Sequence, residues 1–138
     1  MPSKSTTTKK YTYAVGRRRS AVATIKLFSG KSESKVNDKA ISKYFKDLFS
    51  DKIYLKPFEV TSTKSKYYFE ARILGGGKKS QLEALALAIS RALRIIDADK
   101  YGPILRTAGL LTVDSRVRQR RQVGKGGKAR RQKQSPKR

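Results

Sequence analysis

The stretch GGGKKS at residues 75–80 contains the residue types that hold phosphate groups. In a nucleotide-binding P-loop, glycines let backbone N–H groups wrap a phosphate, and a Lys followed by Ser or Thr completes the site. Here the G-x-x-x-x-G spacing is absent, and Lys79 separates Lys78 from Ser80. Nucleotide hydrolysis is therefore disfavoured. The stretch predicts a glycine-rich turn from a strand into a helix, where free N–H groups, the helix dipole and the two lysines suit an RNA phosphate.

Three adjacent arginines, Arg17, Arg18 and Arg19, form a second candidate phosphate site. Such a run is often only a solvated charge cluster. At the entrance to a strand, however, successive side chains point to both sides, and guanidinium groups bind phosphate oxygens bidentately. We expect at least two of the three to contact phosphate.

Catalytic chemistry has little support in this sequence. It contains no Cys and no His, which removes thiolate nucleophiles, imidazole bases and nearly all zinc sites. Asp97 and Asp99 lie near basic residues without a partner for acid–base work. We expect no enzyme activity, no cofactor and no metal site.

Residues 116–138 form a basic segment without any Asp or Glu. Only Val117, Val123 and Ala129 are apolar, so burial cannot offset an ordering entropy of about 1–2 kcal/mol per residue. Fully extended, the segment could reach on the order of 75 Å. The pattern predicts ordering by an external polyanion, with nucleic acid the first candidate and an acidic membrane surface the second.

Charge also divides the whole chain of 138 residues, whose formal net charge is +24. All the acidic residues lie between residues 27 and 115, and both ends are purely basic. This division predicts a flexible basic arm at 1–10, one globular domain at 11–113 and an extended tail at 114–138.

Hydrophobic periodicity predicts the elements that must position these groups. Alternation predicts strands at 21–28 and 67–74, a short run at 35–36 before a turn at Asn37 and Asp38, and an extended segment at 58–60. Helical spacing predicts helices at 41–49 and 78–96, and Asp99 is expected to cap a further short helix that ends near Gly109. Residues 110–113 are expected to dock on the core, which contains Phe45, Phe49 and Phe69.

Strands followed by helices indicate an α+β fold, a small mixed sheet of about four strands with helices on one face.

Four segments resemble the family of ribosomal protein nine of the small subunit, in its bacterial or organellar form. GGGKKSQLEALALAISRAL resembles the family signature, with Gln81 at its glutamine. YAVGRRRSAVATIKL resembles the family's opening, VNDKAISKYF its turn and first helix, and LRTAGLLTVDSRV with GKGGKARR its C-terminal part. The resemblance covers about residues 11–138.

The resemblance implies a structural constituent of the small ribosomal subunit, in the cytoplasm or in an organelle, with the fold of the second domain of small-subunit ribosomal protein five. It implies contacts with rRNA and neighbouring proteins of the subunit head, no membrane and no homo-oligomer. It also implies that Lys137 and Arg138 reach the anticodon stem-loop of the peptidyl-site tRNA. The residues expected to bind rRNA are Arg17, Arg18, Arg19, Lys78, Lys79, Gln81, Arg116, Arg118, Arg120, Arg121, Lys125, Lys128, Arg130, Arg131 and Lys133.

Two other classes remain as alternatives: a DNA-coating or general polyanion-binding protein, which would leave GGGKKSQ and its helix unexplained, and a P-loop enzyme.

Overall fold

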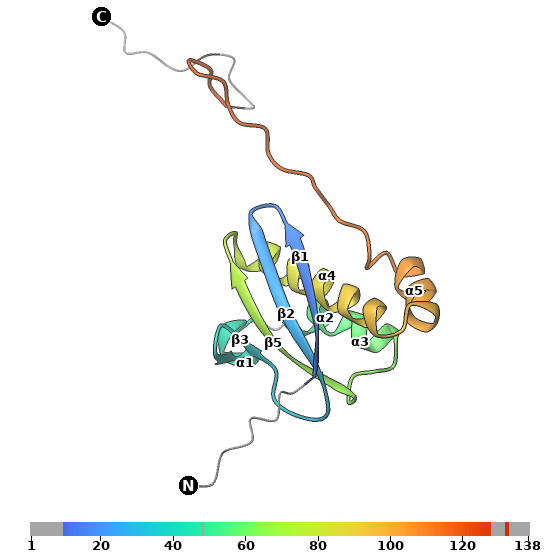
Figure 1. Ribbon diagram of the computed structural model, residues 1–138. Helices are drawn as coiled ribbons and strands as arrows, with labels where there is room; N and C mark the ends of the chain where they lie inside the picture. Colours follow the sequence, from blue (N-terminus) through green and yellow to red (C-terminus); the bar gives the residue numbers. More distant parts are fainter. Residues whose placement is uncertain (1–9, 48, 128–131, 133–138) are drawn as a thin grey trace, which may run out of the picture.

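A computed structural model describes residues 10–47, 49–127 and 132 and shows an α+β domain followed by an extended segment (Figure 1). The fold class predicted from the sequence is confirmed. The elements in chain order are β1 (Tyr11–Arg18), β2 (Ala21–Ser29), β3 (Lys35–Val36), β4 (Lys39–Ala40), α1 (Ile41–Tyr44), α2 (Ser50–Tyr54), α3 (Lys56–Val60), β5 (Tyr67–Leu74), α4 (Lys78–Ile96) and α5 (Ala98–Thr107).

The strands form one mixed sheet in the order β1-β2-β5-β3-β4. β1, β2 and β5 are antiparallel neighbours over their whole length, and the short hairpin β3–β4 joins the edge of β5 in parallel. Asn37, in the turn of that hairpin, fixes the junction: its amide side chain exchanges two hydrogen bonds with the backbone of Ile73, at 2.9 and 3.0 Å. The sheet has five strands, one more than the expected number, because this small hairpin contributes two.

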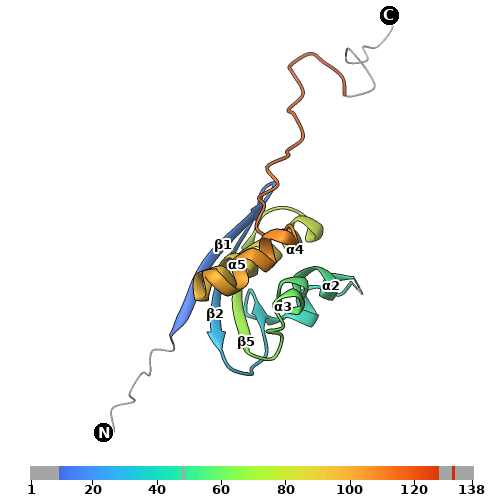
Figure 2. The same cartoon turned by 90° about the vertical axis from the view of Figure 1, so that its right-hand side faces the viewer.

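The helices lie on one side of the sheet and leave the other side uncovered (Figure 2). α4 is the main covering element and packs against β1 and β2, while Tyr54 and Phe58 of α2 and α3 pack against Phe69 of β5. The buried core lies between these layers. Its fully buried large apolar side chains include Ile25, Leu27, Phe69, Ile73, Leu85, Ile89 and Leu93.

Close contact between β1 and α4 depends on Gly16. A Cβ placed there would overlap the carbonyl oxygen of Ala84 and lie 2.6 Å from the backbone nitrogen of Ala88. The other inward positions of β1 include Thr12 and Ala14. This strand therefore shows no alternation of large apolar residues, which is why the sequence pattern did not indicate it.

The region between β4 and β5 differs most from expectation. The predicted helix at 41–49 is confirmed only over its first turn: α1 ends at Tyr44, because Phe45 takes an extended conformation and is buried in the core. Phe49, predicted as a core residue, is 69% exposed. Residues 58–60 are helical rather than extended, because Pro57 occupies the first turn of α3, where its missing N–H costs nothing.

The predicted helices after the glycines are confirmed, with one correction. α4 has the expected bounds. The residue that caps α5 is Asp97, not Asp99, and its carboxylate accepts a hydrogen bond from the backbone N–H of Lys100 at 3.0 Å. Asp99 lies inside the first turn, where its charge favours the helix dipole.

After α5 the chain turns back and passes along α4 before it leaves the domain. Leu110 and Leu111 pack against the core, as predicted for residues 110–113, although Val113 is 43% exposed. Residues 115–125 are exposed and have no regular secondary structure apart from a turn, and they run away from the domain in both views (Figures 1 and 2).

Candidate nucleic-acid interface

The turn between β5 and α4 presents the features expected of an anion-binding site. Gly75 and Gly76 have φ values of 74° and 65°, in the left-handed region that favours glycine. α4 then begins at Lys78 without a side-chain cap and without an acidic residue in its first turn. Lys78 and Lys79 are both exposed there. The positive end of the helix dipole and two cations therefore face solvent together.

Gln81 is expected to bind RNA, but both the nitrogen and the oxygen of its side-chain amide make hydrogen bonds within the protein. It is 9% exposed. Its Nε2 donates to the carbonyl of Gly75 at 2.9 Å, and its Oε1 accepts from the Tyr44 hydroxyl at 3.1 Å. Gln81 thus ties the glycine turn to α1, and its contact with rRNA stays a prediction.

Lys78 extends a basic cluster that the sequence analysis missed. Its Nζ lies 3.9 Å from the ring centroid of Tyr44 and donates to the Tyr44 carbonyl at 3.1 Å. A pocket of about 410 Å³ beside it has three further lysines in its lining: Lys39, Lys43 and Lys46. These lysines come from β4, α1 and the following loop, and the contact of Tyr44 with Lys78 joins this part of the chain to the start of α4.

The three adjacent arginines point in different directions. Arg17 is exposed, on the side of the sheet away from the helices. Arg19 is exposed in the two-residue turn between β1 and β2, with a φ of 53°. Arg18 faces the helices, and its side chain is only 11% exposed. Two guanidinium groups are therefore free for phosphate, and the third is engaged inside the protein.

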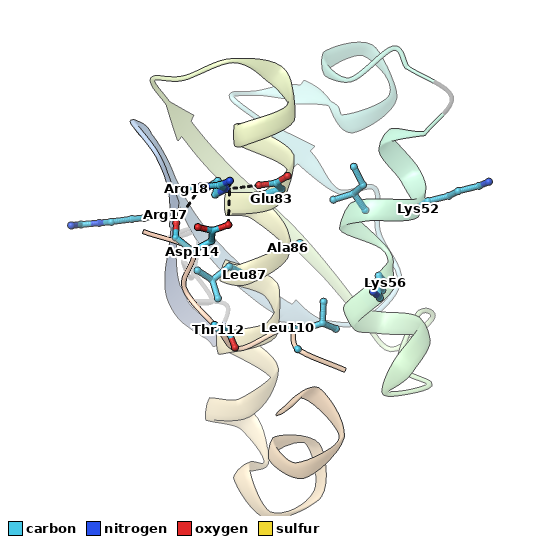
Figure 3. Close-up of a pocket in the computed structure, with 12 residues that line it drawn as sticks. Arg17, Arg18, Lys52, Lys56, Glu83, Ala86, Leu87, Leu110, Thr112 and Asp114 are labelled. Carbon is cyan, nitrogen blue, oxygen red and sulfur yellow. Dashed lines mark hydrogen bonds and ion pairs between the residues drawn. The ribbon is translucent and has the colours of Figure 1, made fainter. Parts of the chain in front are cut away.

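Arg18 connects β1, α4 and the start of the tail (Figure 3). Its Nε donates to Oε2 of Glu83 at 2.6 Å, and its Nη2 lies 3.2 Å from Oδ2 of Asp114. Nη1 also donates to the carbonyl of Arg116 at 3.1 Å. The planar guanidinium thus fixes the point at which the tail leaves the domain. Its predicted contact with rRNA remains a prediction.

Asp114 accepts further bonds from Arg116, whose Nη2 lies 2.7 Å from Oδ2 and whose backbone N–H lies 3.1 Å from Oδ1. These hydrogen bonds and the nearby positive charges hold the pKa of the Asp114 carboxyl well below its usual range. The same pair raises the pKa of Arg116. Both groups stay charged at neutral and mildly acidic pH.

The two predicted phosphate-binding turns meet at the end of the domain from which the tail departs. A Cβ on Gly75 would overlap the carbonyl oxygen of Ser20, and one on Gly76 would lie 2.9 Å from the Cβ of Ala21. The β1–β2 turn and the β5–α4 turn are therefore in contact. A pocket of about 610 Å³ lies between this hairpin and the tail, lined by Arg18, Arg19, Ser20, Arg116, Val117 and Arg118.

A second groove, of about 460 Å³, lies on the helix side of Arg18 (Figure 3). Arg18, Glu83 and Asp114 form one wall, and Ala86 and Leu87 of α4 lie beside them. Arg17 and Lys52 point away from the groove on opposite sides (Figure 3). Leu110, Thr112 and Asp114 line the same groove, so the segment that leads into the tail forms part of its wall.

The predicted tail residues fall into three groups. Arg116 is paired with Asp114. Arg118, Arg120, Arg121 and Lys125 are exposed. The others lie outside the described residues: Lys128, Arg130, Arg131, Lys133, Lys137 and Arg138.

In the part of the chain that the structure describes, no group of His, Cys, Asp or Glu could hold a metal ion. Within the same residues, no helix is both long enough and apolar enough to cross a bilayer.

Comparison with known proteins gives consistent matches along the chain. Residues 16–138 match the family model described as ribosomal protein S9/S16. A small ribosomal subunit protein uS9 from Desulfotalea psychrophila is 42% identical over 115 residues, which are 83% of this chain and 88% of the relative. The uS9 protein of Mesomycoplasma hyopneumoniae (strain 7448) is 39% identical over 126 residues, 91% and 94% of the two chains. That of Leifsonia xyli subsp. xyli is 42% identical over 111 residues, 80% of this chain and 66% of the relative.

Proposed function

The chain belongs to the ribosomal protein S9/S16 family, and from that premise we propose that one end of its domain binds rRNA while its tail extends along RNA to the tRNA in the peptidyl site. Proteins of this family are structural, non-enzymatic components of the small ribosomal subunit, so the place of this chain is in the ribosome.

The observation that carries the rRNA proposal is the convergence of three basic segments at one end of the domain. The β1–β2 turn supplies Arg19, the β5–α4 turn supplies Lys78 and Lys79, and Arg18 holds the tail beside them. Backbone N–H groups at a helix start and side-chain cations bind phosphate oxygens with charge-assisted hydrogen bonds. A folded RNA that brings several phosphates together matches this arrangement.

The tail favours a polyanion as its partner for a different reason. Residues 115–125 are exposed, and this part of the tail has Arg116, Arg118, Arg120, Arg121 and Lys125 without an acidic residue. Cationic side chains that are not buried against their own domain can bind RNA phosphates, and the release of condensed counterions favours this binding. The tail thus acts as an extension of the rRNA-binding surface.

The tRNA contact rests on the likeness of residues 116–138 to the C-terminal part of the family. Family membership supports assigning it to Lys137 and Arg138, which lie outside the described residues. A fully extended segment of this length could reach on the order of 75 Å, so cations at its end could meet an RNA that the domain itself does not touch.

This proposal is tested with small subunits that contain the double variant Lys137→Ala/Arg138→Ala. We expect assembly to be unchanged and the affinity for peptidyl-site tRNA to fall about tenfold, because charge-assisted hydrogen bonds to phosphate are lost. Filter binding of labelled tRNA to purified subunits measures the affinity.

The control is Lys31→Ala/Lys35→Ala, which removes two exposed lysines from the loop before β3 and from β3 itself. It lowers net charge equally and should leave tRNA binding unchanged. Equal affinities for the two variants would contradict the tRNA contact and leave the rRNA role standing.

The alternative of a general DNA-binding protein predicts a different distribution. Such a protein would be enriched on chromosomal DNA and would dissociate from small subunits during sedimentation in high-salt gradients. We expect cosedimentation with small subunits and no such enrichment.

A further inference from the structure

The uncovered face of the sheet carries a row of aromatic side chains that the proposed function does not use. In the strand register, Tyr11 of β1, Phe28 of β2 and Tyr68 of β5 lie opposite one another. Phe28 and Tyr68 stack with ring centroids 5.1 Å apart and planes inclined by 13°, and Tyr11 lies 5.7 Å from Phe28. The sequence alone does not show that these rings share a face, because the row depends on the register of three strands.

Two tyrosine rings on this face are accessible to solvent: Tyr11 in the row and Tyr13 beside it. Tyr11 is 48% exposed and Tyr13 is 54% exposed, whereas Phe28 is 8% exposed between its neighbours. Tyr11 and Tyr13 are two residues apart on one strand, so both project from the same face, about 7 Å apart along the strand. Phe28 lies beside Tyr11 on the neighbouring strand, with the two ring planes inclined by 56°.

Positive charge surrounds these rings. The outward positions of the same three strands include Arg17, Lys26 and Arg72, against one carboxylate, Glu70. The Nζ of Lys26 lies 5.1 Å from the ring centroid of Tyr11. A protein neighbour that covered this face would have to desolvate three cations at a cost, while RNA would pair its phosphates with them and stack its bases on the rings.

We infer that this face binds unpaired nucleotides of rRNA, with bases stacked on Tyr11 and Tyr13 and phosphates paired with Lys26 and Arg72. The inference rests on the proposed contact of the domain with rRNA and adds a second surface to it. The first surface holds phosphates at the end of the domain, and this one holds bases on the side of the sheet opposite the helices.

The test uses the absence of Trp from the chain. In Tyr13→Trp the new indole is the only one, and its emission reports stacking directly. The full-length variant is titrated with an unstructured oligoadenylate of about eight nucleotides, and the anisotropy of a label on the RNA records total binding. The matched control is Ile104→Trp, at an exposed apolar position of α5 in the helix layer.

We expect RNA binding to quench the indole at position 13 and to leave the indole at position 104 nearly unchanged. In addition, Tyr11→Ala/Tyr13→Ala should weaken binding about tenfold or more. If anisotropy shows binding but the emission of the two indoles is quenched equally, the inferred stacking surface is refuted and the proposed rRNA role stands. If no RNA binds at all, both fail.

A second measurement identifies the occupant in the ribosome. A benzophenone amino acid at position 13 is incorporated into small subunits and activated by light. Crosslinks to nucleotides in single-stranded segments support the inference. Crosslinks to a neighbouring protein would overturn it.

Discussion

At the scale of single residues, adjacent arginines have different surroundings. Arg17 and Arg19 are exposed, while Arg18 pairs with Glu83 and Asp114 and donates a hydrogen bond to the backbone carbonyl of Arg116. The prediction that these arginines bind negatively charged oxygen atoms is correct for Arg18, which binds carboxylates. The sequence could not show whether the anion is an RNA phosphate or a carboxylate of the same chain, because Glu83 and Asp114 are 65 and 96 residues away.

Replacement of Arg18 tests this assignment. Arg18→Ala should lower the free energy of unfolding by about 1–2 kcal/mol, since it leaves Glu83 without its partner in a half-exposed position. It should also release residues 110–116 from α4, seen as faster amide hydrogen exchange there. The neighbouring variant Arg17→Ala should stay within about 0.5 kcal/mol of the parent and weaken RNA binding only. Matching stability losses in the two variants would refute the anchoring role of Arg18.

At the scale of elements, segments with a regular apolar pattern of their own were predictable, and segments shaped by tertiary contacts were not. α4 and β5 have repeating apolar positions along their whole length, so the sequence analysis identified both. α1 is a single turn because burial of Phe45 outweighs the helical spacing of residues 41–49. β1 lacks large apolar side chains on its inward face because α4 packs closely against it at Gly16, a tertiary cause that no local pattern contains.

Gly16 is the position at which that close packing can be measured. Gly16→Ala should lower the free energy of unfolding by at least about 2 kcal/mol, because the added methyl meets the backbone of α4 and not a movable side chain. Urea denaturation of the full chain measures the difference. The control is Gly102→Ala inside α5, where a Cβ meets nothing within 4 Å. The control should be neutral or stabilise by up to about 1 kcal/mol, and a similar loss in both variants would contradict the packing account.

At the scale of the whole molecule, the division of charge was readable from the sequence, but the convergence of its basic segments was not. Every acidic residue lies between residues 27 and 115, and the structure uses two of them, Glu83 and Asp114, to hold the base of the tail. Residues 18–20, 75–79 and 114–118 are distant in sequence. The pairing of β1 with β2 and of β2 with β5 brings the first two together, and the contacts of Arg18 hold the third beside them. The lysines near Lys78 were missed for the same reason.

The central claim is that RNA phosphates, and not the core of the domain, hold the tail in its working position. The most direct test is the salt dependence of binding to the rRNA of the subunit head, for the full chain and for a variant with the eleven Lys and Arg residues of 116–138 changed to Gln. With 6 to 10 phosphates contacted by the tail, the slope of log K against log salt should be shallower by about 4–9 in the variant, while its domain remains folded. Equal slopes for the two proteins would contradict the claim.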